Sequence, residues 1–533
     1  MTRSYTGPMS SSLSPTPRRK LPIGIQNLRE IREGGHYYVD KSGLAIDLIE
    51  SSGKAFFLSR PRRFGKSLLV DTFKELFEGN RALFEGLAAE TRWDWSRRHP
   101  VIRISFADGV LQSRAELERR IFEILGDAQR ELGVQGTYES IASRFAELIR
   151  LAHEQHGQSA VVLIDEYDKP ILDNITDPEI ARQMRDGLMN FYSVLKDADA
   201  HLKFVFLTGV SRFSMAGMFS GLNHLQNITL DERWSALCGY TDADVDTVFA
   251  PELPGLDREE IRRRYNGYNW LGESVYNPFD LLRLFENREF RPYWFETGTP
   301  TFLVKLLSER RPYTPDLGRI VATDSLLSTF DVDTLLPEAL LFQAGYLTID
   351  SVWQIPGRRE LTLKYPNKEV QASLNDVLLK SLSGSPEVPE PQISRLYRLL
   401  QAGDVAALRG LFHAFFASIP HDWYRRNELS AFEGYYASIF YSHFAALGLD
   451  IVVEDTTSKG RIDMAVLCFG AVWLFEFKVV ELVPQGRALQ QLQDRGYADK
   501  YRSRGEPIHL VGVEFSKADR NIVGFEVETL AAS

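Results

Sequence analysis

The chain has 533 residues, which is long enough for about three domains that each bury a core. Its 72 acidic residues exceed its 62 basic residues, and the formal net charge of -10 excludes a global positive field that would gather nucleic acid. The two cysteines, Cys238 and Cys468, lack metal-ligand spacing and predict a reducing, cytoplasmic compartment rather than a disulfide framework. No run of 18 apolar residues occurs, so we expect no membrane-spanning helix.

The first part of the chain has the pattern of an α/β domain. Residues 1–20 contain Ser, Pro, Thr and Arg without the apolar stretch of a secretory signal, so we expect a disordered tail. Over residues 21–236, apolar runs of strand length alternate with helical patterns, which predicts a mostly parallel sheet covered by helices on both faces. The predicted strands are residues 54–59, 101–106, 160–164 and 202–207.

The pattern changes twice in the rest of the chain. Residues 237–392 are helical and rich in aromatic residues, and we expect a lid or linker region whose aromatics pack in the core rather than stack on bases, because they lie among Leu, Pro and Gly. Residues 393–533 predict a second α/β domain with helices up to about residue 447. Its remaining predicted elements are strands at 451–454, 461–468 and 471–479, a helix at 486–501 and a strand at 508–515.

A basic loop with one glycine follows the first predicted strand and precedes a predicted helix. In a phosphate-binding loop, backbone amides at a helix N-terminus surround the phosphates, a Lys reaches the terminal phosphates and a Ser hydroxyl ligates magnesium. Arg60 stands where the strict motif has its first glycine, so the pattern is incomplete. The candidate ATP-binding residues are Arg62, Arg63, Phe64, Gly65, Lys66 and Ser67, with Ser67 as a magnesium ligand.

Two later strand ends carry polar residues that complement this loop. Asp165 and Glu166 end a buried strand, as expected if Asp165 orients the magnesium shell and Glu166 polarises the attacking water; a solvated strand end is the alternative. Thr208 or Ser211, after the next strand, is a candidate sensor of the terminal phosphate, although a simple strand cap explains Thr208 equally well. Arg212 is a candidate charge-compensating residue.

A second charged cluster lies near the end of the chain. Glu476 and Lys478 are two residues apart on a predicted strand, so their side chains emerge on one face, while Asp463 precedes them on the neighbouring strand. Two carboxylates that share a magnesium ion, together with a Lys, have the chemistry to cleave a phosphodiester. A structural Glu476–Lys478 pair is the alternative. Glu433 is a candidate third carboxylate, which alone fits a solvated helix position, and Gln491 is a candidate contact to phosphate or water.

The chain resembles a bacterial family in which an AAA-ATPase-like domain is joined to a PD-(D/E)XK nuclease-superfamily domain. The resemblance runs from about residue 21 to residue 515 and implies a P-loop ATPase with an AAA-like parallel sheet, a helical middle region and a restriction-endonuclease-like α/β domain. The family pattern accepts Arg at position 60. The motifs that carry the resemblance are Tyr38–Lys41, Arg60–Ser67, Leu163–Asp168, Thr208–Phe213, Tyr265–Tyr268, Val275–Pro278, Phe342–Leu347 and Tyr365–Val370.

The resemblance also assigns the second cluster to the nuclease core. Glu433, Asp463, Glu476, Lys478 and Gln491 fall on the acidic helix position, the metal-binding Asp, the ExK strand and the polar helix position of that superfamily, and Ile462 replaces the usual Pro. We therefore expect a magnesium-dependent nuclease controlled by ATP, with DNA a better candidate substrate than RNA. A nucleotide-dependent switch that binds nucleic acid or protein without cutting, and a loop that binds ATP without turnover, remain open, as does a homo-oligomer.

Overall fold

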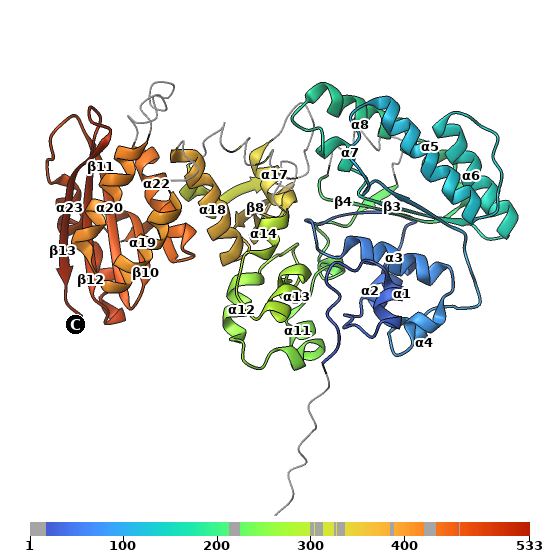
Figure 1. The fold of residues 1–533 in the computed structure, drawn as a ribbon, viewed down its shortest axis with the longest axis horizontal. Coiled ribbons are helices and arrows are strands. Elements are labelled where there is room, and N and C mark those ends of the chain that lie inside the picture. The colour runs from blue at the N-terminus through green and yellow to red at the C-terminus, as the bar shows by residue number, and fades with distance from the viewer. Residues whose placement is uncertain are drawn as a thin grey trace, which may run out of the picture.

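The computed structural model describes residues 18–212, 224–298, 313–323, 336–383, 389–419, 433–457 and 459–532, with Leu303, Leu307 and Leu327. Most of the tail expected over residues 1–20, Phe213 and the stretch 420–432 lie outside this part of the chain. Figure 1 shows an N-terminal α/β region at one end, a mainly helical middle and a C-terminal sheet region at the other end. The expected α/β class with a helical middle region is confirmed.

The N-terminal sheet has five strands, and its order is β2-β3-β4-β1-β5 with every neighbouring pair parallel. The four strands predicted from apolar runs are present because most of their side chains are buried, as a helix-covered parallel sheet requires. β5 is an addition, a short strand that the pattern did not reveal. The strands are β1 (Ala55–Ser59), β2 (Val101–Ser105), β3 (Ala160–Asp165), β4 (Leu202–Gly209) and β5 (Leu225–Asn227).

Helices cover both faces of this sheet. In Figure 1, α5, α6 and α8 lie on one face and α1, α2 and α3 on the other. α3 follows the loop after β1, and its Phe73 ring contacts Phe204 and Phe206 of β4 at centroid distances of 5.2 and 4.9 Å. The helices are α1 (Leu28–Glu33), α2 (Ser42–Glu50), α3 (Lys66–Phe77), α4 (Ala89–Arg92), α5 (Arg114–Glu131), α6 (Ile141–His156), α7 (Lys169–Leu172), α8 (Pro178–Tyr192) and α9 (Val194–Asp197).

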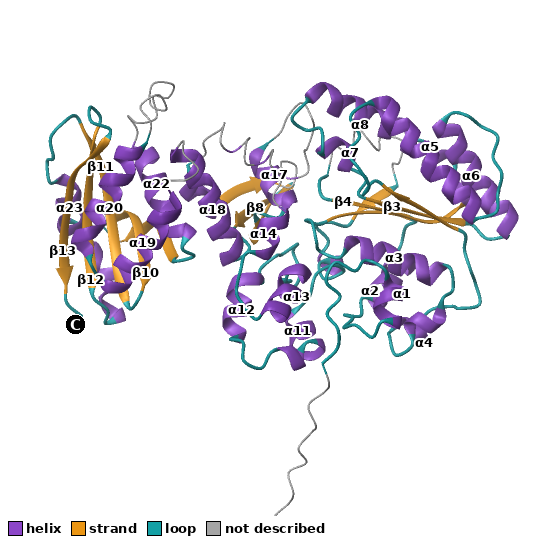
Figure 2. Cartoon of the chain, viewed as in Figure 1, coloured by secondary structure: helices purple, strands orange, loops and turns teal. Residues whose placement is uncertain are grey.

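The middle region is mainly helical, but it also holds a three-stranded antiparallel sheet of order β6-β8-β7 (Figure 2). The sequence pattern did not reveal these strands because most β7 side chains are exposed and β8 begins with Arg-Arg-Glu, so apolar alternation is missing. The elements are α11 (Asp242–Val248), α12 (Arg258–Tyr265), α13 (Pro278–Asn287), α14 (Tyr293–Gly298), β6 (Ile320–Thr323), α17 (Pro337–Ala344), β7 (Thr348–Ile355), β8 (Arg358–Lys364) and α18 (Lys368–Ser383).

The C-terminal region has a five-stranded sheet of order β13-β12-β11-β10-β9, in which only β11 and β12 pair in parallel. The helix predicted over residues 486–501 ends at Asp494 and continues as short 3-10 turns, and β13 was not predicted. α19 begins before the domain boundary expected at residue 392. The elements are α19 (Pro389–Ala402), α20 (Val405–Ser418), α22 (Glu433–Ala446), β9 (Asp450–Thr457), β10 (Gly460–Cys468), β11 (Ala471–Val480), α23 (Arg487–Asp494), β12 (Ile508–Ser516) and β13 (Asn521–Leu530).

Candidate nucleotide and metal sites

The loop between β1 and α3 has the backbone of a phosphate-binding turn. Positive φ angles occur at Arg63 (66°) and Gly65 (86°), and the helix begins at Lys66. Arg60 is outside the positive-φ residues, so this position does not require glycine. Its buried side chain donates hydrogen bonds to the carbonyl oxygens of Ser59, Thr229 and Trp234. Arg60 therefore has a structural role, which explains why it occupies a glycine position of the strict motif.

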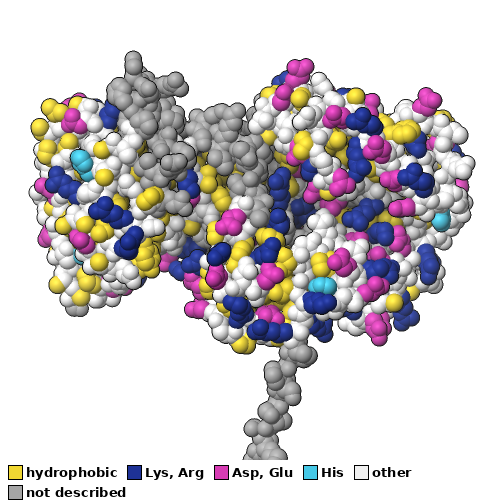
Figure 3. Space-filling model, viewed as in Figure 1, with side chains coloured by type: hydrophobic (Ala, Val, Ile, Leu, Met, Phe, Trp, Pro, Cys, Tyr) yellow, Lys and Arg dark blue, Asp and Glu magenta, His cyan; other side chains and the backbone are white. Residues whose placement is uncertain are grey.

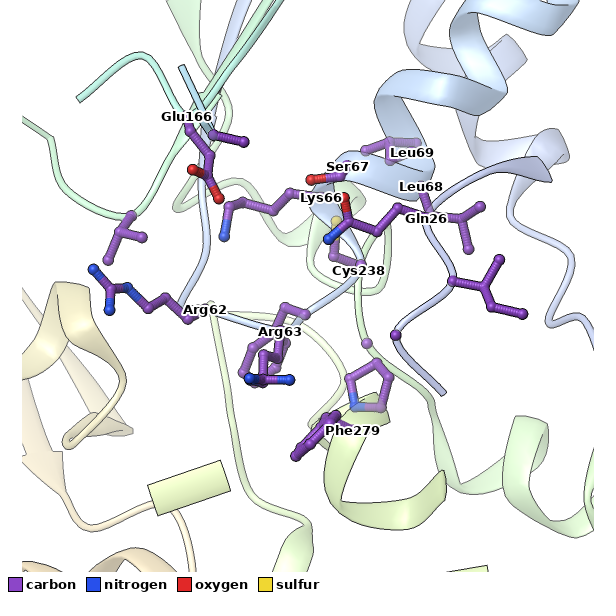
Figure 4. A pocket seen from close by; sticks show the side chains of 18 of the residues that line it. Gln26, Arg62, Arg63, Lys66, Ser67, Leu68, Leu69, Glu166, Cys238 and Phe279 are labelled. Atoms are coloured by element: carbon purple, nitrogen blue, oxygen red, sulfur yellow. The ribbon is translucent and has the colours of Figure 1, made fainter. Parts of the chain in front are cut away.

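A cavity of about 590 Å³ lies over this loop, a volume typical of small-molecule sites. Figure 4 shows Lys66, Ser67 and Glu166 at one side of the cavity and Phe279 at another. The structure thus brings Glu166 to the loop although about 100 residues separate them in sequence. The loop residues named from the sequence all line the cavity: Arg62, Arg63, Phe64, Gly65, Lys66 and Ser67.

The Lys66 ammonium lies inside the loop. Its Nζ donates to the carbonyl oxygens of Arg60 and Pro61 at 3.0 and 2.9 Å. Burial lowers the pKa of Lys66, although the carboxylates of Asp165 and Glu166 oppose this effect. The cation is therefore held by neutral loop carbonyls and is available for exchange with an anion.

The two acids at the end of β3 lie beside Lys66. The Asp165 side chain is buried, and its Oδ1 has no hydrogen-bond partner among the described residues. Glu166 has a φ of 52°, a conformation that a non-glycine residue adopts only where its surroundings demand it. Burial raises the pKa of Glu166, and Lys66 acts in the opposite direction. An unpaired buried carboxylate oxygen and strained backbone are features of a functional site. The free Asp165 oxygen fits a magnesium ligand, although Asp165 itself does not border the cavity.

Thr208 and Arg212 are placed differently from the loop residues. The buried Thr208 hydroxyl donates to the carbonyl oxygen of Leu58 on the neighbouring strand at 2.9 Å, as a strand cap would. Arg212 borders a separate small pocket with Arg60, and its backbone N–H donates to Gln343. Neither residue borders the 590 Å³ cavity.

Asp168 is a residue that the sequence reading missed at this site. It is buried, and its Oδ2 accepts hydrogen bonds from the backbone and hydroxyl of Ser211, both at 2.6 Å. The Ser211 hydroxyl therefore donates its hydrogen bond to Asp168 rather than to a phosphate in this arrangement. Asp168 joins the segment after β3 to the segment after β4, and its place in the motif Leu163–Asp168 was the available signal.

Apolar and aromatic residues that line the same cavity were also missed. Ile25, Tyr38, Tyr240 and Phe279 border it, and the Arg63 guanidinium lies 4.1 Å from the centre of the Phe279 ring. Ile25 precedes α1, Tyr38 lies between α1 and α2, and Tyr240 and Phe279 belong to the middle region. Among them, only Tyr38 belonged to a motif noticed in the sequence. A cavity lined by both charged and aromatic side chains matches the phosphates and base of a nucleotide.

The second site lies on β10 and β11 of the C-terminal sheet. Glu476 is 1% exposed, and its Oε1 accepts hydrogen bonds from Lys478 Nζ at 3.1 Å and from Gln491 Nε2 of α23. Asp463 Oδ2 accepts from the Phe477 backbone N–H at 2.8 Å. Glu433, the first residue of α22, lies 3.7 Å from Lys478 Nζ. All five residues named from the sequence are thus brought together.

Electrostatics at this site favour a cation. Burial raises the pKa of Glu476 to about 7, and repulsion from Asp463 adds to the shift. Burial also raises the pKa values of Asp463 and Glu433. Although burial opposes its charge, the three carboxylates raise the pKa of Lys478. The acids gather at a cost in desolvation, which a bound cation offsets.

The donor set fits magnesium as a two-carboxylate site. Glu476 Oε2 is buried and has no hydrogen-bond partner among the described residues, so it is available as a ligand next to Asp463. Within the same residues, no group of three or more His, Cys, Asp or Glu side chains is placed to hold one metal ion, so Glu433 does not join Asp463 and Glu476 as a third ligand in this arrangement. Magnesium is commonly held by one or two carboxylates and several waters, so this open arrangement suits it.

Glu514 of β12 is a further residue that the sequence reading missed. Its carboxylate accepts hydrogen bonds from the backbone N–H groups of Gly486 at 3.1 Å and Arg487 at 2.7 Å, and also from Gln485 and Ala488. Because these N–H groups begin α23, Glu514 anchors the helix that presents Gln491 to Glu476. Pairing of distant segments created this contact, and no local pattern signals it.

Comparison with known proteins assigns a family to each of the two regions that hold these sites. A family described as "Predicted AAA-ATPase" matches residues 22–219, and the "PD-(D/E)XK nuclease superfamily" matches residues 431–525. The chain belongs to the family that joins these two domains. It is 63% identical over 514 residues to "Uncharacterized protein in vnfD 5'region" of Azotobacter chroococcum mcd 1. The aligned region covers 96% of this chain and 99% of that protein. Among the described residues, no helix is long and apolar enough to cross a membrane.

Proposed function

We propose that the protein binds and hydrolyses ATP in its N-terminal domain and cleaves DNA phosphodiesters, with magnesium, in its C-terminal domain under the control of that nucleotide. The observation that carries the proposal is the contact of Lys478 and Gln491 with the buried carboxylate of Glu476 beside Asp463. We propose that the protein acts in the cytoplasm, alone or as a homo-oligomer.

In the proposed nuclease site, Asp463 and Glu476 hold magnesium and Glu433 completes the acidic rim. Bound magnesium supplies Lewis acidity and lowers the pKa of its water. Lys478, which contacts both Glu476 and Glu433, neutralises charge that develops on the phosphate. Gln491 orients the Glu476 carboxylate and contacts a phosphate or a water.

In the proposed ATPase site, the amides of Arg63, Gly65 and Lys66 surround the phosphates and the Lys66 ammonium exchanges its loop carbonyls for phosphate oxygens. Ser67 and Asp165 hold the magnesium ion, and Glu166 polarises the attacking water. We leave Thr208 and Arg212 out of the proposed site, because their contacts lie elsewhere.

The direct test compares wild type, Lys66→Ala and Asp463→Asn on linear, circular and single-stranded DNA and on RNA, with and without magnesium and ATP. We expect Asp463→Asn to lose cleavage but keep ATP binding, and Lys66→Ala to lose ATP binding and its control of cleavage. Asp519→Asn and Lys203→Ala, two exposed positions, are matched controls that should behave as wild type. Wild type that cuts none of these substrates under any condition would refute the nuclease.

A switch that binds without cutting is the second candidate. Two observations favour it: Lys478 already neutralises Glu476 and Glu433, and charged side chains of both signs are interspersed on the face in Figure 3. In that case chelation of magnesium would leave nucleic-acid or protein binding unchanged. In both candidates, Glu166→Gln should stop ATP hydrolysis and leave ATP binding intact. If the loop only binds nucleotide, Glu166→Gln should change neither.

A further inference from the structure

Trp294 is one of the residues that connect the phosphate-binding loop to the middle region. Trp294 of α14 is buried, and its indole Nε1–H donates to the carbonyl oxygen of Arg62 at 3.1 Å. Gly345, after α17, lies against the same loop, because a Cβ atom there would be 2.6 Å from Pro61 Cγ and 3.4 Å from the Trp294 ring. Pro61, Gly345 and Trp294 therefore pack without free space, and a shift of the loop moves its neighbours.

A bound phosphate would give Lys66 a second set of partners, and so give the loop a second arrangement. Lys66 Nζ now holds the carbonyls of Arg60 and Pro61, which directly precede the Arg62 carbonyl that accepts from Trp294. A phosphate that recruits the ammonium releases those carbonyls. Such an exchange gives nucleotide a different affinity for the two loop arrangements, which is the thermodynamic requirement for a shift in population.

Trp294 passes the connection to α18. Its backbone N–H donates to Asp280 Oδ1 at 2.8 Å and to Glu369 Oε1 at 3.1 Å, and the Phe295 N–H also donates to Glu369 at 3.2 Å. Both acids are buried, and burial raises the pKa of each, that of Asp280 to about 7. Asp280 directly follows Phe279, which lines the nucleotide cavity. The Asp280–Glu369 pair is therefore connected to the cavity through Phe279 as well as through Trp294.

α18 in turn is joined to the helix that starts at the candidate metal site. Within their interface, Ser442 Oγ of α22 donates to Asn375 Oδ1 of α18 at 3.3 Å, and both side chains are fully buried. Near the end of α18, Tyr435 Oη donates to the Leu382 carbonyl at 3.2 Å. α22 begins at Glu433, 3.7 Å from Lys478. Figure 1 shows α18 between the two end regions.

We propose that Trp294 and Glu369 link nucleotide binding at the loop to α22, and through it to the carboxylates around Lys478. The link gives a role to the motifs Phe342–Leu347 and Tyr365–Val370, which neither catalytic site uses. The inference rests on the proposed ATP and metal functions of the two sites. Trp294 and Glu369 are positioning residues, since neither borders the nucleotide cavity or contacts the candidate metal ligands.

The test measures hydrogen exchange in the full chain with and without a non-hydrolysable ATP analogue. Trp294→Phe keeps an aromatic ring but removes the donor to Arg62, and Trp353→Phe, at a side chain that is 72% exposed, is the matched control. We expect nucleotide to change exchange in the loop, in residues 368–383 and in residues 433–446 of wild type and control. In Trp294→Phe the loop response persists, while the response of both helices falls at least about threefold.

A second variant tests the next step. Ser442→Ala removes the hydroxyl that joins α22 to Asn375, so the response of α18 persists and that of α22 falls. Equal responses in wild type, Trp294→Phe and Ser442→Ala would overturn the link. Loop protection in wild type without any change in α18 or α22 would also overturn it, yet leave the proposed ATP site standing. No nucleotide protection of the loop in wild type would refute the ATP site and the link together.

Discussion

The guanidinium of Arg60 lies 4.0 Å from the centre of the Trp270 ring, although 210 residues separate the two in sequence. Arg60 is fully buried, and burial lowers its pKa to about 10. Its two terminal nitrogens donate to backbone carbonyls of β1 and of the segment after β5. The residue that departs from the strict glycine motif thus ties the loop to the middle region.

Replacement of Arg60 by Ala should destabilise the fold. The change removes three buried hydrogen bonds and the stacking on Trp270, which together predict a loss of about 2–4 kcal/mol in the free energy of unfolding. Urea unfolding measures this. Arg97→Ala, at an exposed arginine, is the control and should change stability by less than about 0.5 kcal/mol. If Arg60→Ala unfolded at the same urea concentration as wild type, the structural role of Arg60 would be contradicted.

Gly345→Ala should weaken nucleotide binding. Gly345 has a φ of 91°, and the added Cβ would lie 2.6 Å from Pro61 in the loop. Gly357→Ala is a matched control, because Gly357 has a φ of 82° but nothing within 4 Å of an added Cβ. Both changes cost about 1–2 kcal/mol of backbone strain. Titration with a fluorescent ATP analogue should show at least about tenfold weaker binding for Gly345→Ala alone. Equal affinities in the two variants would contradict the contact.

Acid should destabilise the C-terminal domain through His443. Burial between Phe412 and Phe415 lowers the pKa of His443 from 6.5 to about 4, so the folded chain excludes a proton that the unfolded chain binds. The contribution is present in full above pH 6.5 and is lost as pH falls towards 4, by up to about 3 kcal/mol.

His443→Leu should reduce this pH dependence. The free energy of unfolding, measured in urea at pH 7.5, 6 and 5, should fall less steeply in His443→Leu than in wild type. His413→Gln, an exposed histidine of α20, should retain the wild-type slope. Parallel pH profiles for wild type and His443→Leu would exclude His443 as the cause.

Glu514→Ala should impair cleavage without affecting ATP binding. The carboxylate is the shared acceptor for the first N–H groups of α23, so its loss should cost about 2–3 kcal/mol and release Gln491 from Glu476. We expect magnesium-dependent cleavage to fall at least about tenfold. Glu526→Ala, an exposed acid of the neighbouring β13, should cleave like wild type. Full activity in Glu514→Ala would show that α23 needs no such anchor.

Local sequence predicted the elements whose residues are buried as continuous runs. β1 and β3 are fully of this kind and β2 and β4 nearly so, and β9 to β12 also carry enough apolar residues to be recognised. β5, β6, β7 and β8 were missed because they are short or partly exposed, so their pairing depends on partners rather than on their own composition. β13 does alternate at Val523, Phe525 and Val527, a signal that a closer reading would have found.

The sequence by itself determined the chemical groups: a Lys and Ser at a helix start, acids at a strand end, and an acid and Lys two residues apart on a strand. These patterns are local, because a turn or a strand sets them within a few residues. Tertiary structure alone decided that Arg60 meets Trp270, that Asp168 holds Ser211 and that Trp294 joins the loop to Glu369. Such contacts depend on how separate segments pack, and periodicity within one segment carries no information about its distant partner.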